Sequence, residues 1–175
     1  DNIDIAAATR KGVVVMNTPD ANTISAAEHT MALLLSLSRN VSYGHQSILS
    51  GNWDRHKFIG SELRSKSLGI IGLGKIGREV MQRALGFNMK ILGFDPFIKK
   101  EMLRPDEIEL LDLNDLVEKS DFITIHIPLT DNTKNLFDYK MLSKMKKEAR
   151  IINVARGGII NESDLAKVLH EGNIG

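Results

Sequence analysis

The hexapeptide GLGKIG, which runs from Gly72 to Gly77, constrains the fold of this chain more than any other stretch. An apolar run at 68–73 leads into it, and a helical pattern at 75–85 follows it. The next apolar run, at 90–94, is followed at once by an acidic residue, Asp95. A glycine loop between a strand and a helix, with an acid after the next strand, is typical of a βαβ unit that binds a dinucleotide.

Each glycine of this loop has its own predicted task. Gly72 allows the tight turn out of the strand, and Gly74 lets a pyrophosphate approach the backbone. Gly77 lets the helix pack closely on the strand. The first amides of the helix would then face two phosphates along a favourable dipole.

Asp95 bears on the choice of cofactor. We expect its carboxylate to accept hydrogen bonds from the adenosine ribose and to repel a 2′-phosphate, which favours NAD over NADP. The nearby basic residues are Lys99 and Lys100, and we expect Pro96 to turn them away from the site.

Three other interpretations of the loop have to be weighed: a glycine turn that only packs a helix, a protein kinase, and an S-adenosylmethionine-dependent methyltransferase. A kinase would carry valine two residues after the last glycine, where this chain has Glu79. A methyltransferase also has a glycine loop and an acid after its second strand, but the GxGxxG spacing fits a pyrophosphate better. We therefore expect a dinucleotide site.

Apolar runs and helical patterns alternate over the rest of the chain. Strands are expected at 13–16, 68–73, 90–94, 108–110, 122–127 and 150–154. Helices are expected at 1–10, from a cap at Asn22 or Thr23 towards Leu49, and at 75–85, 113–119, 139–144 and 161–171. Such alternation predicts an α/β fold with a doubly wound parallel sheet of the Rossmann type, in three α-β-α layers and truncated at its C-terminal end.

Composition excludes several other functions. The chain has 23 Lys plus Arg against 22 Asp plus Glu, a net charge of +1, so it shows no electrostatic footprint for nucleic acid or an anionic membrane. It has no cysteine, which fits an intracellular setting, and its five histidines show no metal-ligand spacing. The most apolar stretch, MALLLSLS at 31–38, is far shorter than a membrane span.

The stretch RIINVARGGII, at 150–160, places Arg156 directly after an apolar strand and before two glycines. Strand ends of a doubly wound sheet point into the ligand crevice, so Val154, Ala155 and Arg156 should face a bound nicotinamide. The planar guanidinium suits the carboxylate of a 2-hydroxy or 2-oxo acid. The alternative is an exposed loop arginine beside a helix start.

Four segments together resemble the D-isomer-specific 2-hydroxyacid dehydrogenases. They are GIIGLGKIGREV, FDP at 94–96, HIPLTDNT at 126–133 and NVARGG at 153–158. Within that family, TRKGVVVMNTPDANTISAAEHTMALLLSLSRN and GNWDRHKFIGSEL resemble the members that oxidise 3-phosphoglycerate. The resemblance covers essentially the whole chain.

The resemblance implies a two-domain subunit, in which residues 1–20 are a remnant of a substrate domain and residues 21–175 are the NAD-binding domain. The helix from Asn22 would be a linker that also builds a homodimer or higher homo-oligomer. The family's catalytic histidine and its glutamate would lie beyond this stretch, so we expect the fragment to bind NAD without turnover. His170 matches no family site. A cytoplasmic protein is implied.

The resemblance also assigns residues to the cofactor, with Arg156 as the catalytic arginine. His126 would either line the adenosine side or be a half-buried histidine at a strand end, and Thr133 would lie near the cofactor or cap a helix. The expected cofactor-binding residues are Gly72, Gly74, Lys75, Ile76, Gly77, Asp95, Pro96, His126, Ile127, Pro128, Thr133, Val154, Ala155 and Arg156.

The resemblance leaves the substrate open. A phosphorylated hydroxy acid fits best, and hydroxypyruvate or glycerate, lactate and formate are alternatives, as is a non-enzymatic NAD-sensing dimer like the corepressor relatives. Arg55, His56 and Lys57 could contribute to a phosphate site across a dimer interface, or they could form a solvated basic loop.

Overall fold

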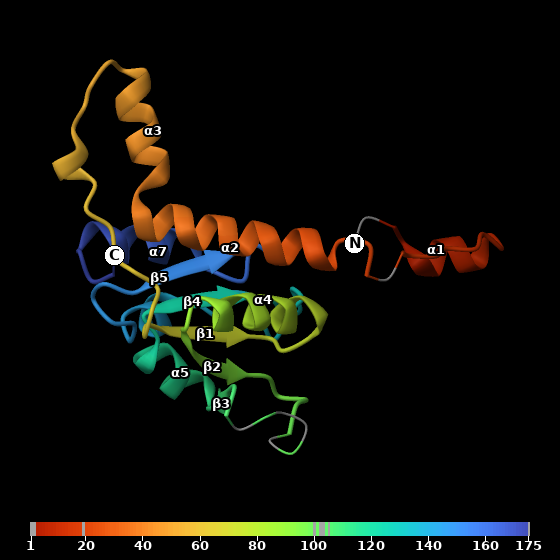
Figure 1. Ribbon diagram of the computed structural model, residues 1–175. Helices are drawn as coiled ribbons and strands as arrows, with labels where there is room; N and C mark the ends of the chain where they lie inside the picture. The colour runs from red at the N-terminus through yellow and green to blue at the C-terminus, as the bar shows by residue number, and fades with distance from the viewer. Residues whose placement is uncertain (1–2, 19, 100, 102–103, 105, 175) are drawn as a thin grey trace.

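A sheet of five parallel strands forms the centre of the molecule (Figure 1), and the computed structural model describes residues 3–18, 20–99, 101, 104 and 106–174. The strands are β1 (Ser67–Ile71), β2 (Lys90–Phe94), β3 (Glu109–Leu110), β4 (Phe122–Ile125) and β5 (Arg150–Asn153). They lie in the order β3-β2-β1-β4-β5, and every ladder is parallel. The predicted doubly wound α/β fold is confirmed.

The strand order reverses beside β1. The chain runs outwards from β1 through β2 to β3, and it then returns to the other side of β1 with β4 and β5. Ligands of open parallel sheets bind beyond the carboxyl ends of the strands at such a reversal. The segments that meet there are the glycine loop after β1 and the loops that follow β4 and β5.

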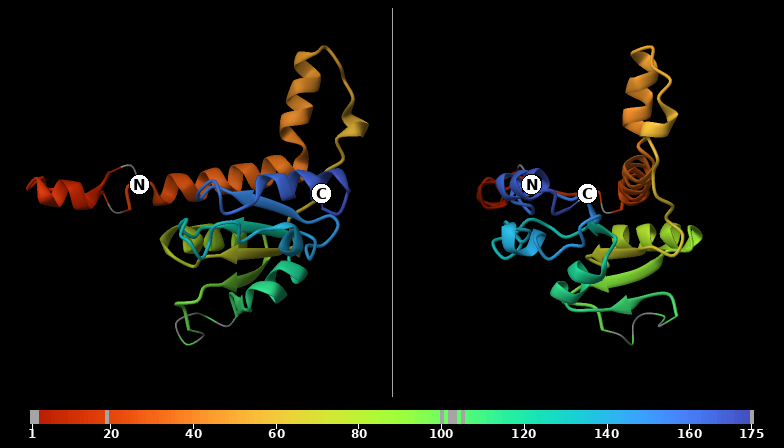
Figure 2. Two further views of the ribbon diagram at one scale, coloured as in Figure 1. Left: turned by 180° about the vertical axis from the view of Figure 1, so that it is seen from behind. Right: turned by 90° about the vertical axis from the view of Figure 1, so that its left-hand side faces the viewer.

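Helices cover both faces of the sheet and complete three layers, as the two views of Figure 2 show. Helices α2 (Thr23–Arg39) and α4 (Lys75–Gly86) pack on the face to which Leu68 and Ile70 of β1 belong. Helices α5 (Leu113–Lys119), α6 (Tyr139–Leu142) and α7 (Glu162–His170) cover the face of Ile71. All five residues of β1 are buried, as expected of a central parallel strand covered on both sides.

The segment from 22 to 49 is two helices and not the single long helix that its apolar pattern predicts. Helix α2 ends at Arg39, and α3 (Val41–Leu49) begins after Asn40, which adopts a left-handed φ of 53°. Asparagine tolerates this conformation better than most residues. The chain therefore turns sharply there, and α3 projects away from the body together with the short helix η1 (Arg55–Lys57) (Figure 1).

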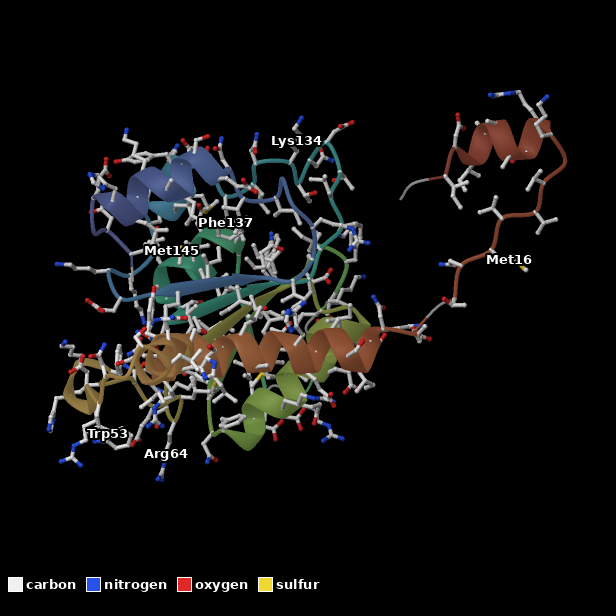
Figure 3. All side chains as sticks on the ribbon, turned by 90° about the horizontal axis from the view of Figure 1, so that it is seen from above. Met16, Trp53, Arg64, Lys134, Phe137 and Met145 are labelled. Carbon is white, nitrogen blue, oxygen red and sulfur yellow. The ribbon has the colours of Figure 1, made fainter. Side chains whose placement is uncertain are left out.

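The N-terminal arm, residues 3–18, extends away from the sheet (Figure 3, where Met16 lies far from the core residues Phe137 and Met145). It contains α1 (Ile5–Arg10), but the strand predicted at 13–16 is wrong. Val14 is 80% exposed and Met16 85% exposed, and within the described part of the chain this segment pairs with no strand. A β-branched run needs a neighbouring strand to form a ladder, and the arm offers none.

Candidate cofactor site

The glycine loop leaves β1 through a backbone turn that only glycine makes at low cost. Gly72 has a φ of 93°, and its amide donates to the Phe94 carbonyl oxygen at 2.8 Å. A Cβ on Gly72 would lie 2.6 Å from the carbonyl oxygen of His126, and a Cβ on Gly77 would overlap the carbonyl oxygen of Gly72. In contrast, a Cβ on Gly74 would meet nothing within 4 Å. Two glycines are therefore needed for packing, and the third borders open space.

The N-terminus of α4 offers unshielded amides to an anion. Its N-cap, Gly74, provides no capping side chain, and the first turn contains no acidic residue. The positive end of the helix dipole is thus not compensated from within α4, as an anion site requires. Lys75, the first residue of the helix, adds a cation whose Nζ lies 2.5 Å from Oδ1 of Asp20.

Asp95 follows β2 and holds the glycine loop from the side. Its Oδ2 accepts a hydrogen bond from the Leu73 amide at 2.8 Å, and its Oδ1 accepts one from the Phe97 amide at 2.9 Å. Asp95 borders a hollow of about 520 Å³ between the ends of β2 and β3. Lys99 borders the same hollow, so Pro96 does not turn it away as expected, and Lys100 lies outside the described residues.

His126 follows β4 and is held neutral. Burial lowers the pKa of its imidazole from 6.5 to about 4. Its Nε2 lies 2.9 Å from Oγ1 of the fully buried Thr124, so the ring is oriented from within the sheet. An uncharged imidazole can form a directional hydrogen bond with a ligand without adding a charge.

Thr133 shapes the loop after β4. Its Oγ1 accepts a hydrogen bond from the Thr130 amide and donates one to the Pro128 carbonyl oxygen, each at 2.7 Å. The hydroxyl thereby closes the turn that presents Pro128. Thr133 begins no helix, and it does not border the cavity that Pro128 lines.

Arg156 is positioned by the side chain of Asn153, the last residue of β5. Asn153 accepts a hydrogen bond from the Ala155 amide at 3.0 Å through Oδ1, and it donates one to the Arg156 carbonyl oxygen at 2.8 Å through Nδ2. Gly158, with a φ of 82°, then turns the chain back towards the body. The exposed Arg156 side chain donates from Nη1 to the Ala155 carbonyl oxygen at 2.8 Å.

A cavity of about 590 Å³ lies where these loops meet, beyond the carboxyl ends of β4 and β5. It collects half of the predicted residues and adds three others: Asn22 just before α2, Ala26 within α2, and Leu129. The lining is Asn22, Ala26, Ile76, His126, Ile127, Pro128, Leu129, Val154, Ala155 and Arg156. The other predicted residues lie elsewhere: Gly72, Gly74, Lys75 and Gly77 form the glycine loop and the start of α4, Asp95 borders the separate hollow, and Thr133 forms the supporting turn. Pro96 lines neither hollow. Because β1 lies between β2 and β4, the glycine loop stands between the two hollows, as a dinucleotide that spans both halves of a Rossmann sheet requires.

Sequence reasoning missed Asn22, Ala26, Leu129 and Asn153. It treated Asn22 as a helix cap, but the Asn22 side chain makes no capping hydrogen bond. The asparagine before Val-Ala-Arg was a usable local signal for Asn153, because asparagine side chains commonly bind the backbone two residues on. No local signal marks Ala26, since its place depends on packing against a strand more than 120 residues away.

A family model described as D-isomer specific 2-hydroxyacid dehydrogenase, NAD binding domain, matches residues 31–175. The chain belongs to this family. The match also confirms NAD as the cofactor of the domain.

Relatives of this dehydrogenase domain agree in sequence and in fold. The D-3-phosphoglycerate dehydrogenases of Methanocaldococcus jannaschii and Synechocystis sp. are 49% and 48% identical to it, over 99% and 100% of the chain. The chain spans about a third of their length, 33% and 32%. The apo structure of Escherichia coli D-lactate dehydrogenase matches with a TM-score of 0.92 at 30% identity, over 100% of this chain and 55% of that one. The structure of Aquifex aeolicus D-lactate dehydrogenase complexed with NAD and lactic acid matches with a TM-score of 0.87 at 29% identity, over 99% of this chain and 52% of that one.

None of the helices within the described residues has the length and apolar character needed to cross a bilayer. Nor do three or more potential metal ligands of the His, Cys, Asp or Glu type come together among them.

Proposed function

We propose that this domain belongs to an enzyme that oxidises 3-phospho-D-glycerate to 3-phosphohydroxypyruvate, a reaction of serine biosynthesis, with NAD as oxidant. The main support for the proposal is that Arg156 lines the cavity while the Asn153 side chain donates a hydrogen bond to its backbone carbonyl oxygen. The names of the relatives support the choice of substrate. Oxidation of glycerate, lactate or formate, or NAD sensing without turnover, would be the alternatives.

Different residues along the crevice would bind different parts of the cofactor. The first amides of α4, with Lys75, would hold the pyrophosphate, and Asp95 would bind the adenosine ribose. Bound NAD supplies the acceptor for the hydride that leaves C2 of the hydroxy acid. Val154 and Ala155 provide backbone groups beside the nicotinamide end of the cavity.

Arg156 carries the chemistry that this domain contributes. Its guanidinium would bind the substrate carboxylate through paired hydrogen bonds and stabilise charge on the C2 oxygen as the carbonyl forms. The half-buried, uncharged His126 adds no competing cation to that end of the crevice. We assign proton removal from the hydroxyl to a histidine, oriented by a glutamate, in another part of the full-length protein.

The arm and the projecting helices fit the proposed architecture. Residues 1–20 would belong to a substrate domain, and α2, α3 and the following loop would form a homodimer interface. Tyr43, Trp53 and Ile59 are 71%, 78% and 81% exposed, an unusual density of large apolar side chains for a free surface. A monomer by sedimentation velocity at micromolar concentration would contradict the dimer. The cytoplasm as the compartment stays a prediction.

Arg55, His56 and Lys57 do not line the cavity of their own chain. Lys57 forms an ion pair with Asp54 at 2.8 Å, and both side chains lie at the surface. Within this chain they form a solvated basic loop.

The test uses the full-length protein with Arg156→Ala. Turnover of 3-phosphoglycerate should fall by at least about 100-fold, because removing one charge-stabilising donor costs about 3–4 kcal/mol in the transition state. NAD affinity, measured by calorimetry, should stay within about five-fold, since the pyrophosphate and ribose contacts remain. Arg64→Ala is the matched control, because Arg64 is exposed and borders none of the cavities described above (Figure 3).

Normal turnover in Arg156→Ala would remove the proposed mechanism. Faster turnover of lactate or glycerate than of 3-phosphoglycerate by the unaltered protein would overturn the substrate. An unaltered protein that binds NAD but turns over none of these acids would favour the regulator.

A further inference from the structure

An ion pair joins the cofactor loop to the segment that leads into α2. Nζ of Lys75, at the start of α4, lies 2.5 Å from Oδ1 of Asp20. The two residues are 55 positions apart, so the contact depends on the tertiary fold. The side chains are 68% and 55% exposed, and solvent therefore keeps the pair weak and exchangeable.

The pair places a negative charge where the cofactor's own negative charge has to bind. The first turn of α4 contains no acid, so its amides and dipole favour an anion. Asp20 brings a carboxylate to that end from another part of the chain. The Lys75 ammonium is a compact point charge, and a carboxylate and a diphosphate cannot both hold it at full strength.

The backbone holds Asp20 in place. Its φ of 73° lies in the left-handed region, which aspartate tolerates better than most residues. Its carbonyl oxygen accepts the Thr23 amide at 3.2 Å and so closes the turn that opens α2. The next residues lead directly to Asn22, which lines the cavity. The carboxylate is thus presented to Lys75 by a formed turn that is continuous with the site.

We propose that Asp20 is a positioning residue that competes with the cofactor's pyrophosphate for Lys75. Binding of a dinucleotide exchanges the carboxylate for a phosphate oxygen on Lys75 and releases the turn at 20–22 from α4. Asp20 therefore sets a lower NAD affinity than the loop could otherwise reach, and it couples cofactor binding to the segment that joins the arm to α2. The inference rests on the proposed placement of the pyrophosphate at α4.

The test measures the dissociation constant of NAD by calorimetry for the unaltered protein, Asp20→Asn, Lys75→Gln and the double variant. Asparagine also adopts left-handed backbone, so Asp20→Asn removes the charge and keeps the turn. We expect it to tighten NAD binding about two- to five-fold at low salt, the range of an exposed ion pair, and to lose most of this gain at about 0.5 M NaCl. Lys75→Gln should weaken binding, and Asp20→Asn should add no gain in that background.

Two further variants serve as a control and as a substitute for Asp20→Asn. Asp115→Asn removes a surface carboxylate that pairs with Lys119 on α5, so it controls for net charge and should leave the dissociation constant unchanged. Asp20→Gly also fits a positive φ, and it repeats the measurement should the asparagine variant fail to fold.

Each outcome decides a separate point. An unaltered protein that ignores NAD would overturn the placement of the cofactor and this inference with it. If the unaltered protein binds NAD and Asp20→Asn binds equally or less tightly, the competition alone is overturned. The competition is likewise overturned if Asp115→Asn gives an equal gain, or if the gain persists in the Lys75→Gln background.

Discussion

Gly77 is the position where one added methyl group should damage both the fold and the cofactor site. A Cβ there would overlap the Gly72 carbonyl oxygen and lie 3.1 Å from the Gly72 carbonyl carbon and 3.4 Å from Cγ2 of Ile70. Two of these three atoms belong to the backbone of the glycine loop, so either the loop or α4 has to move. Because the clash is with backbone atoms, the cost lies in the upper part of the range for overpacking, about 2–3 kcal/mol, and the better helix propensity of alanine returns about 1 kcal/mol.

For Gly77→Ala we therefore expect a net loss of about 1–2 kcal/mol in the free energy of unfolding. In a domain of this size that lowers Tm by about 2–8 °C. NAD affinity should fall at least about ten-fold, because the displaced loop no longer presents the amides at Gly74 and Lys75. The free energy of unfolding is measured by urea unfolding, with a check that the m value is the same for both proteins, and NAD affinity is measured by calorimetric titration.

Gly86→Ala is the matched control within the same helix. Gly86 is the last residue of α4, a Cβ there would meet nothing within 4 Å, and its φ is not positive. The control should be neutral or more stable by up to about 1 kcal/mol, with unchanged NAD affinity. Equal stability and equal NAD binding in Gly77→Ala and Gly86→Ala would refute the reasoning from the loop geometry.

Three other predictions follow from the charged groups. Asp95→Asn should reduce the preference for NAD over NADP at least about ten-fold, and an unchanged ratio of the two dissociation constants would contradict the role of its carboxylate. For Asp121, burial alone would raise the pKa, but hydrogen bonds from Lys146 and from the amide and hydroxyl of Ser67, with the Lys146 charge, outweigh burial and lower it. Asp121 therefore adds stability above the unfolded pKa of about 3.9 that is lost as pH falls through its lower folded pKa. The unaltered protein should have a higher Tm than Asp121→Asn at pH 6, and this difference in Tm should shrink below about pH 4. A constant difference down to about pH 2 would exclude this linkage. His126, whose folded pKa of about 4 lies below its ordinary 6.5, should make the protein lose stability between those two pH values, because only the unfolded chain takes up the proton there. His126→Gln should flatten that slope in a pH series of urea midpoints; an unaltered slope would show that other groups produce it.

The central βαβ units could be predicted closely because their signals are local. The strand at 90–94 and the helix at 113–119 agree with β2 and α5 to the residue. In each case a short apolar pattern is bounded by Asp95 or Asp112, and the Asp112 side chain caps α5 through the Asp115 amide at 2.9 Å. The prediction of a strand at 13–16 was wrong for the opposite reason, since its β-branched residues meet no partner strand among the residues that the structure describes.

In the candidate site, too, local signals could be predicted and contacts between distant segments could not. Residues directly after the strands, such as Asp95, His126 and Arg156, could be named from the sequence because parallel strands deliver their carboxyl ends to one edge. The approach of Asn22 to the cavity and the pairing of Asp20 with Lys75 could not be predicted from the sequence. Both require α2 to dock against β5 and α4.

The sequence by itself determined the parallel α/β sheet, the glycine turn and the order of chemical groups along the crevice. Backbone freedom at glycine and the alternation of apolar segments are properties of neighbouring residues. The tertiary structure alone decided the bend at Asn40, the lowered pKa of His126 and the carboxylate beside Lys75. Burial, charge proximity and shared cavities depend on groups that are far apart in the chain and meet only after folding.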